Sequence, residues 1–193
     1  MAVAAVRPAT RDDVDEIVRI QSTTWRTAYA ELVPEEALAR LSDPAAREAW
    51  AAAVTAGEGH HVLVATEGEW TVGFCAAAPA RVDDPEAPAG RGQIMTLLVE
   101  PRWGRRGHGR RLLTAVFAAL AEDGATEAVA WVPEPDVASR ACYDRVGWDP
   151  DGMMRVLDTG DRELREIRLA GPTRIEDRNP RRGQAVEVRP DGA

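Results

Sequence analysis

A glycine- and arginine-rich segment near the middle of the chain contains the residue types that bind phosphate groups. The segment contains Gly104, Gly107 and Gly109 together with Arg102, Arg105, Arg106, Arg110 and Arg111. An apolar run precedes it and an amphipathic pattern follows, as where a strand leads into a helix. Glycine lets main-chain N–H groups approach a ligand closely, and a helix N-terminus carries about half a positive charge. The pattern therefore predicts a site for a small polyanion.

Two common phosphate-binding motifs do not fit this segment. A dinucleotide-binding fingerprint would have a third glycine at position 112, where the chain has Leu112. A P-loop needs a lysine followed by serine or threonine, and the sequence contains no lysine. An arginine-rich loop that contacts only solvent is the alternative interpretation. The position of the segment at a strand–helix junction, with a second motif downstream, favours the binding site.

The second motif surrounds Tyr143. Residues 136–148 read Asp-Val-Ala-Ser-Arg-Ala-Cys-Tyr-Asp-Arg-Val-Gly-Trp, the pattern of a short helix that ends near a glycine. In order and spacing, this motif and the glycine segment together resemble the GNAT N-acetyltransferase superfamily. The superfamily's second motif is usually Asn-x-x-Ala-x-x-Phe-Tyr-x-x-x-Gly-Phe. The chain matches it at Tyr143, Gly147 and Trp148, and departs from it at Asp136.

The resemblance extends to the glycine segment and covers about residues 3–170. The acetyl-CoA loop of the superfamily is usually Gln/Arg-x-x-Gly-x-Gly/Ala, and residues 104–109 match it except that Gly104 replaces the first side chain. The resemblance implies that acetyl-CoA is the co-substrate and that an amine attacks it directly, through a tetrahedral intermediate. It implies that acetyl-CoA contacts Leu98, Val99, Arg105, Arg106, Gly107, His108, Gly109, Arg110 and Asp136.

Tyr143 is the expected catalytic residue. A phenol has an ordinary pKa of about 10 and a thiol one of about 8.5, so a tyrosine can protonate a departing thiolate at neutral pH. The resemblance assigns this role to Tyr143; the alternative is a helix tyrosine that packs on the sheet with its hydroxyl satisfied. Main-chain N–H groups at Leu98 or Val99 are expected to stabilise the oxyanion.

The acceptor is expected to be the amine of a small molecule or a peptide. The resemblance implies that Trp25, Tyr29 and Glu31 shape its pocket. Residues 1–100 hold 16 acidic side chains and 8 arginines, which favours a cationic amine. The sequence is also compatible with a homodimer.

The general base is not assigned. Gln93 stands where many relatives have a glutamate, and an amide cannot take up a proton. The residues that could relay a proton through water are Glu31, Glu100, His60 and His61. The departures at Gly104, Asp136 and Gln93 support an alternative function, a catalytically weak domain that binds or senses acyl-CoA.

The elements that position these residues follow a mixed α/β order. Apolar runs predict strands at 3–6, 61–66, 70–78, 93–99, 126–132, around 156 and at 164–169. Capping residues and helical periodicity predict helices that begin near 12, at 34, 44, 107 and 136. The resemblance implies a twisted, mostly antiparallel sheet of about seven strands, flanked by helices and splayed at its middle strands. One domain over 1–170 and a polar, mobile tail over 171–193 are expected.

The composition excludes several other classes of protein. The 24 basic side chains are all arginine, so a Schiff-base lysine is impossible, and none of the three serines lies in G-x-S-x-G. Cys75 and Cys142 are far apart, so neither a metal site nor a disulfide is expected. The net charge of −8 argues against a nucleic-acid partner. Because the sequence has neither a signal peptide nor a long apolar stretch, no membrane contact and a cytoplasmic location are expected.

Overall fold

The computed structural model describes residues 3–80, 87, 89–160 and 162–175. The first half contains β1 (Ala4–Pro8), the 3-10 turn η1 (Arg11–Asp13), α1 (Val14–Ala28), α2 (Glu35–Arg40), α3 (Pro44–Ala53), β2 (His61–Glu67), β3 (Trp70–Pro79) and β4 (Arg91–Val99). The second half contains the 3-10 turn η3 (Pro101–Trp103), α4 (His108–Glu122), β5 (Glu127–Pro133), α5 (Val137–Asp144), β6 (Asp149–Asp158) and β7 (Glu163–Pro172). The predicted order of helices and strands is confirmed.

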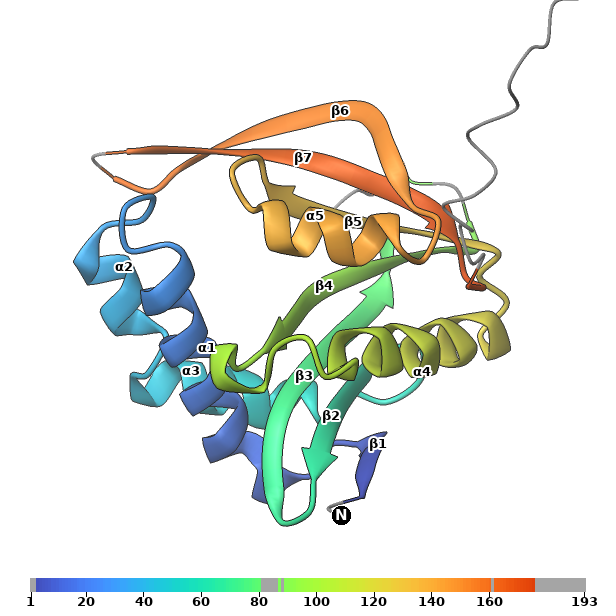
Figure 1. Cartoon of the computed structure of the whole chain (residues 1–193), viewed down its shortest axis with the longest axis horizontal. Coiled ribbons are helices and arrows are strands. Elements are labelled where there is room, and N and C mark those ends of the chain that lie inside the picture. Colours follow the sequence, from blue (N-terminus) through green and yellow to red (C-terminus); the bar gives the residue numbers. More distant parts are fainter. Residues whose placement is uncertain (1–2, 81–86, 88, 161, 176–193) are drawn as a thin grey trace, which may run out of the picture.

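The seven strands form one sheet in the order β1-β2-β3-β4-β5-β7-β6. All neighbouring strands are antiparallel except β4 and β5, which are parallel. The helices α4 and α5 lie on one face of the sheet, and α1 and α3 lie on the other (Figure 1). The predicted fold class, a mostly antiparallel sheet of about seven strands flanked by helices, is confirmed. No helix in the described ranges combines the length and apolar character needed to cross a membrane.

The sheet opens between β4 and β5. These strands pair at only four positions, Arg91–Ile94 with Glu127–Ala130, and then diverge. The register between β3 and β4 also shifts at Met95, because Ala77 lies opposite Ile94 while Ala76 lies opposite Thr96. An extra residue of this kind bends a strand and increases its twist. The bulge lies where the pairing with β5 ends, and the expected splay of the middle strands is confirmed.

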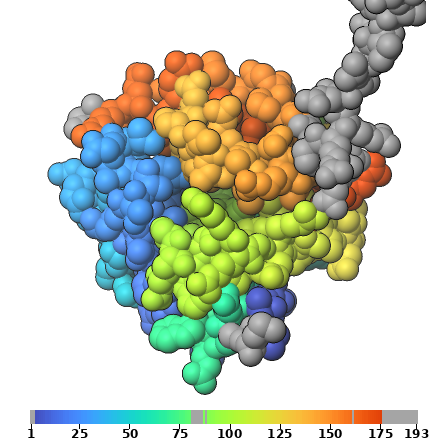
Figure 2. Space-filling view, viewed as in Figure 1, coloured from blue at the N-terminus to red at the C-terminus, as the bar shows by residue number. Residues whose placement is uncertain are grey.

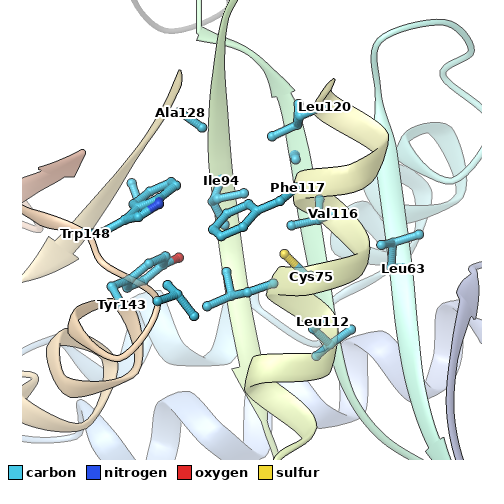
Figure 3. Packing of buried hydrophobic residues seen from close by; sticks show 14 of the residues in the cluster. Leu63, Cys75, Ile94, Leu112, Val116, Phe117, Leu120, Ala128, Tyr143 and Trp148 are labelled. Carbon is cyan, nitrogen blue, oxygen red and sulfur yellow. The ribbon is translucent and has the colours of Figure 1, made fainter. Parts of the chain in front are cut away.

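A stack of three aromatic rings fixes α5 against the rest of the fold (Figure 3). The ring of Trp148 lies between Phe117 of α4 and Tyr143 of α5, with centroid distances of 5.2 Å to each. Gly171 of β7 makes room for this ring, because a Cβ there would lie 2.2 Å from a Trp148 ring atom. The position of Tyr143 is therefore set by α4 and β7 together.

The folded domain continues past residue 170. The strand β7 pairs with β5 up to Pro172, and the hydroxyl of Thr173 donates to the carbonyl of Ala125 at 2.6 Å. Ile175 packs against the core that α4 forms with the sheet. Residues 171–175, expected to belong to the tail, are thus part of the fold, and 176–193 lie outside the described residues.

Candidate active site

Two main-chain N–H groups of β4 face the gap between β4 and β5. The N–H of Glu100 donates to the carbonyl of Val72 at 2.9 Å, and in an antiparallel pair such hydrogen-bonded positions alternate with open ones. The N–H of Leu98 therefore points toward β3, whereas those of Leu97 and Val99 point away from it. Because β5 has already left the ladder, these two groups have no strand partner within the described part of the chain.

This orientation corrects one expected donor. The oxyanion donor is expected at Leu98 or Val99, but Leu98 directs its N–H into the β3–β4 ladder. Its side chain is buried with Ile17 and Phe74 in the core beneath α1. The open positions are Leu97 and Val99.

A pocket of about 80 Å³ lies in this gap. Its lining residues come from α1, β4, β5, α5 and β7 and are Trp25, Tyr29, Ile94, Met95, Thr96, Leu97, Leu98, Trp131, Val132, Pro133, Ser139, Tyr143 and Glu166. Since α5 covers one face of the sheet and α1 the other, the pocket joins the two faces. On the face shown in Figure 2, α5 and α4 are separated by a furrow.

Tyr143 reaches from α5 toward β4 and borders this pocket (Figure 3). The residue is 3% exposed, and its hydroxyl forms no hydrogen bond with any described residue. Burial raises the pKa of Tyr143 well above its ordinary value, and neighbouring ionisable groups, Cys75 first, raise it further. The hydroxyl therefore stays protonated across the neutral range and is not engaged in a structural bond, as a proton donor requires.

Asp136 caps the N-terminus of α5 and connects that helix to α1. One carboxylate oxygen accepts the N–H of Ser139 at 2.9 Å, and the other accepts the Ser139 hydroxyl at 2.6 Å and the hydroxyl of Tyr29. Burial, and then the bond to Asp136, raise the pKa of Tyr29. Both oxygens of Asp136 are thus engaged inside the protein. These bonds position α5 and Tyr29, and the expected contact of Asp136 with acetyl-CoA stays a prediction.

The loop before α4 has the geometry of an anion-binding turn. Gly107 is the N-cap of α4 with φ of 82°, and Arg105 has φ of 60°. A Cβ on Gly109 would lie 3.2 Å from the Sγ of Cys142, so glycine allows α4 and α5 to approach closely. The exposed arginines beside the turn include Arg105 and Arg110. The loop therefore fits a pyrophosphate group, which needs open main-chain N–H groups and nearby guanidinium groups.

His108 points its side chain into the protein rather than toward the loop surface. Its side chain is 1% exposed, and its Nε2 lies 2.8 Å from a carboxylate oxygen of Glu67. The second oxygen of Glu67 accepts from Arg106 at 3.1 Å, and the Arg106 guanidinium lies 4.8 Å from the ring centroid of Trp103. The imidazole of His108 thus holds the loop to the β2–β3 hairpin, and a contact of its main chain with acetyl-CoA stays a prediction.

The expected acceptor residues separate into two groups. Trp25 and Tyr29 line the pocket, with their rings edge to face at 5.0 Å. Glu31 is exposed outside the pocket lining, and its carbonyl accepts a hydrogen bond from Arg162 at 2.6 Å. Glu31 therefore does not line this pocket, and its expected role toward the acceptor stays a prediction.

Glu166 is the pocket residue that sequence reasoning missed. It lies on β7, is 8% exposed, and accepts a hydrogen bond from the Nε of Arg155 at 2.6 Å. The sequence could have indicated this position, because Glu166 lies two residues after the apolar Leu164 and the two side chains therefore share one face of a strand. The groups considered as proton relays do not line the pocket: Glu100 pairs with Arg19 and Arg102, and His61 lies 2.5 Å from Asp123.

Comparison with known proteins identifies the family. The model of the acetyltransferase (GNAT) family matches residues 15–148, which is more than half of the chain, and the protein therefore belongs to this family. An uncharacterized N-acetyltransferase of Bacillus subtilis (strain 168), YuaI, is 29% identical over 133 residues, covering 68% of this chain and 73% of that protein.

Solved structures show the same fold. The ribosomal-protein-alanine N-acetyltransferase from Brucella melitensis superposes with a TM-score of 0.71 at 21% identity and covers 87% of this chain and 99% of its own. PaiA N-acetyltransferase from Thermoplasma acidophilum, solved in complex with coenzyme A, has a TM-score of 0.68 at 15% identity and covers 88% of this chain and 99% of its own.

Proposed function

We propose that the protein transfers the acetyl group of acetyl-CoA to the amine of a small molecule or a peptide. One observation carries this proposal: the open N–H groups of Leu97 and Val99 and the unbonded hydroxyl of Tyr143 border the same gap in the sheet. Membership in the GNAT family and the coenzyme A bound to PaiA support acetyl-CoA as the co-substrate.

Leu97 and Val99 supply hydrogen-bond donors where negative charge develops. When bound, acetyl-CoA would provide a thioester. The acceptor amine forms a C–N bond to its carbonyl carbon, the C–S bond to CoA breaks, and the carbonyl oxygen carries negative charge in between. A preorganised main-chain N–H pointing at that oxygen contributes roughly 2.7–4 kcal/mol to catalysis. The donors at Leu97 and Val99 need no rearrangement, because the divergence of β5 leaves them free of a ladder.

Tyr143 returns a proton to the departing sulfur. The raised pKa of its buried phenol keeps the hydroxyl protonated at neutral pH, so the proton is available when the thiolate forms beside it. The stack on Trp148 holds the ring in position. The phenolate that remains is costly in this buried site, so it regains a proton from solvent before the next turnover.

Glu166 takes the proton that the acceptor amine must lose. An amine attacks only in its neutral form, and Glu166 is the one carboxylate among the described residues that line the pocket. It pairs with Arg155 at 2.6 Å, and a carboxylate at this place attracts the ammonium form of the acceptor. Trp25 and Tyr29 form the wall on the α1 side.

Arg105, Arg106 and Arg110 hold the pyrophosphate of the co-substrate, with main-chain N–H groups at the start of α4. Arg106 is already oriented by Glu67 and by the ring of Trp103. The N-terminus of α4 has no acidic residue in its first turn, so its dipole is not offset there.

Two measurements test this function. Calorimetry should show acetyl-CoA and CoA binding well below millimolar concentration, and an assay of released thiol over a panel of amines should find at least one acceptor above the background without amine. Absence of binding to both would overturn the proposal. Binding without turnover of any amine would instead identify a domain that senses CoA.

A further inference from the structure

A second pocket, of about 250 Å³, lies on the face of the sheet opposite α4 and α5. It adjoins the first pocket at Trp131, which lines both. Three arginines line it, Arg91, Arg155 and Arg168, and its described lining residues include no carboxylate. Arg91 donates to Glu127 at 3.0 Å, so a negatively charged group in this pocket would be attracted mainly by Arg155 and Arg168.

The guanidinium groups of Arg155 and Arg168 are held in place but retain hydrogen-bonding capacity. Their carbon atoms lie 4.5 and 5.6 Å from the ring centroid of Trp131. Only the Nε of each is engaged within the described chain, Arg155 with Glu166 at 2.6 Å and Arg168 with Asp151 at 2.8 Å. The Nη groups remain as donors, and the two Nη groups of one guanidinium can donate to the two oxygens of a carboxylate.

Arg155 also connects the two pockets. It lines the second pocket while pairing with Glu166, which lines the first. A negative group therefore faces the gap in the sheet, and positive groups face the adjoining pocket. The side chain of Arg168 is 16% exposed, so its charge is only partly screened by water.

We propose that the acceptor carries a carboxylate next to its amine, as an amino acid does. The Nη groups of Arg155 and Arg168 bind the carboxylate above Trp131, and the amine extends toward Glu166 and the gap. This inference rests on the proposed acetyl transfer, of which it names the acceptor class.

Matched acceptors test the inference. The standard L-amino acids and their α-amides are compared in the thiol-release assay, where we expect kcat/KM to be roughly 10–100-fold higher for the acids, as for loss of one charge-assisted contact. Arg168→Gln should lower kcat/KM for the acids by a similar factor, so that the ratio of acid to amide falls toward one. Arg165→Gln is the control, because Arg165 lies on the same strand, outside the pocket, and pairs with Glu134 at 3.4 Å.

A binding measurement separates this inference from the proposed function. Calorimetry compares N-acetyl-L-methionine with N-acetyl-L-methioninamide on the wild-type protein and on Arg168→Gln. Preference for the acid that disappears in Arg168→Gln supports the anion site, even if no amine is acetylated and the proposed function fails. Equal affinity for the two compounds, or an equal loss in Arg165→Gln, would overturn the inference.

Discussion

Tyr143 and Glu166 reach one pocket from opposite faces of the sheet. Tyr143 comes from α5, and Glu166 comes from the face of β7 that packs toward α1 and α2. The tyrosine is predictable from the sequence, because it lies within a motif. The glutamate is not, because a charged residue in a strand is usually solvated, and its burial depends on which helices cover that face.

Replacing Tyr143 with phenylalanine tests the proton donor. Phenylalanine keeps the ring stack on Trp148 and removes only the hydroxyl. We expect kcat to fall roughly 100-fold with little change in the KM for acetyl-CoA, measured by thiol release. A wild-type kcat in this variant would remove the tyrosine from the mechanism.

Glu166→Gln tests the proton acceptor through its pH dependence. At pH 7 we expect kcat/KM for the acceptor to fall roughly 100-fold, because the amine then loses its proton without assistance. With an α-amide or a peptide as the acceptor, the deficit should shrink toward pH 9, since such an α-amine has a pKa of about 8 and is by then largely neutral. Glu134→Gln serves as the matched control, because Glu134 pairs with Arg165 on the exposed surface. A deficit that is constant with pH would mean that Glu166 only binds.

At the scale of elements, the sequence predicts the strands and helices but not their hydrogen-bond register. The run 93–99 is recognisable as a buried strand from its apolar composition. Whether Leu97 or Leu98 faces the gap depends on which positions bond to β3, and composition does not encode this. The apolar residues Met153, Met154 and Val156 of β6 are exposed, and the strand begins earlier than the pattern around Val156 indicates.

Gly109 controls the approach of α4 and α5. In Gly109→Val, the new side chain would press on Cys142 and move α5, with Tyr143, away from the loop. Overpacking of this kind costs about 1–3 kcal/mol, so we expect the Kd for acetyl-CoA to rise roughly tenfold in calorimetry. Adding Cys142→Ala should restore part of the affinity. If the double variant binds no better than Gly109→Val, steric contact with Cys142 is not the cause.

At the scale of the whole molecule, stability at high pH depends on the buried tyrosine and cysteine side chains rather than on the arginines. Every basic side chain is an arginine, which stays charged to above pH 12, so its ion pairs persist in alkali. Burial raises the pKa values of Tyr29, Tyr143, Cys75 and Cys142. As pH rises, these groups therefore lose their protons in the unfolded chain at a lower pH than in the folded protein.

The sign of the pH effect follows from these raised pKa values. Below about pH 8.5 all four groups are protonated in the folded and in the unfolded chain, so they do not make the free energy of unfolding depend on pH. Above about pH 8.5 the unfolded chain binds fewer protons than the folded one, so the free energy of unfolding falls as pH rises. Urea titrations should show the fall beginning near pH 8.5 and steepening above pH 10, by about 1.4 kcal/mol per pH unit for each ionised group. Tyr29→Phe should flatten the steep part. A constant free energy up to pH 11 would contradict the prediction.

The divergence of β5 from β4 also has a consequence for amide hydrogen exchange. Thr96 and Leu98 direct their amides into the ladder with β3, whereas the amides of Leu97 and Val99 face the gap. In the free protein, neighbouring amides of one strand should therefore exchange at alternately slow and fast rates, although the whole strand is equally well folded. A molecule that fills the gap and accepts from Leu97 and Val99 would make the rates along β4 uniform, which gives a direct readout of where the co-substrate lies.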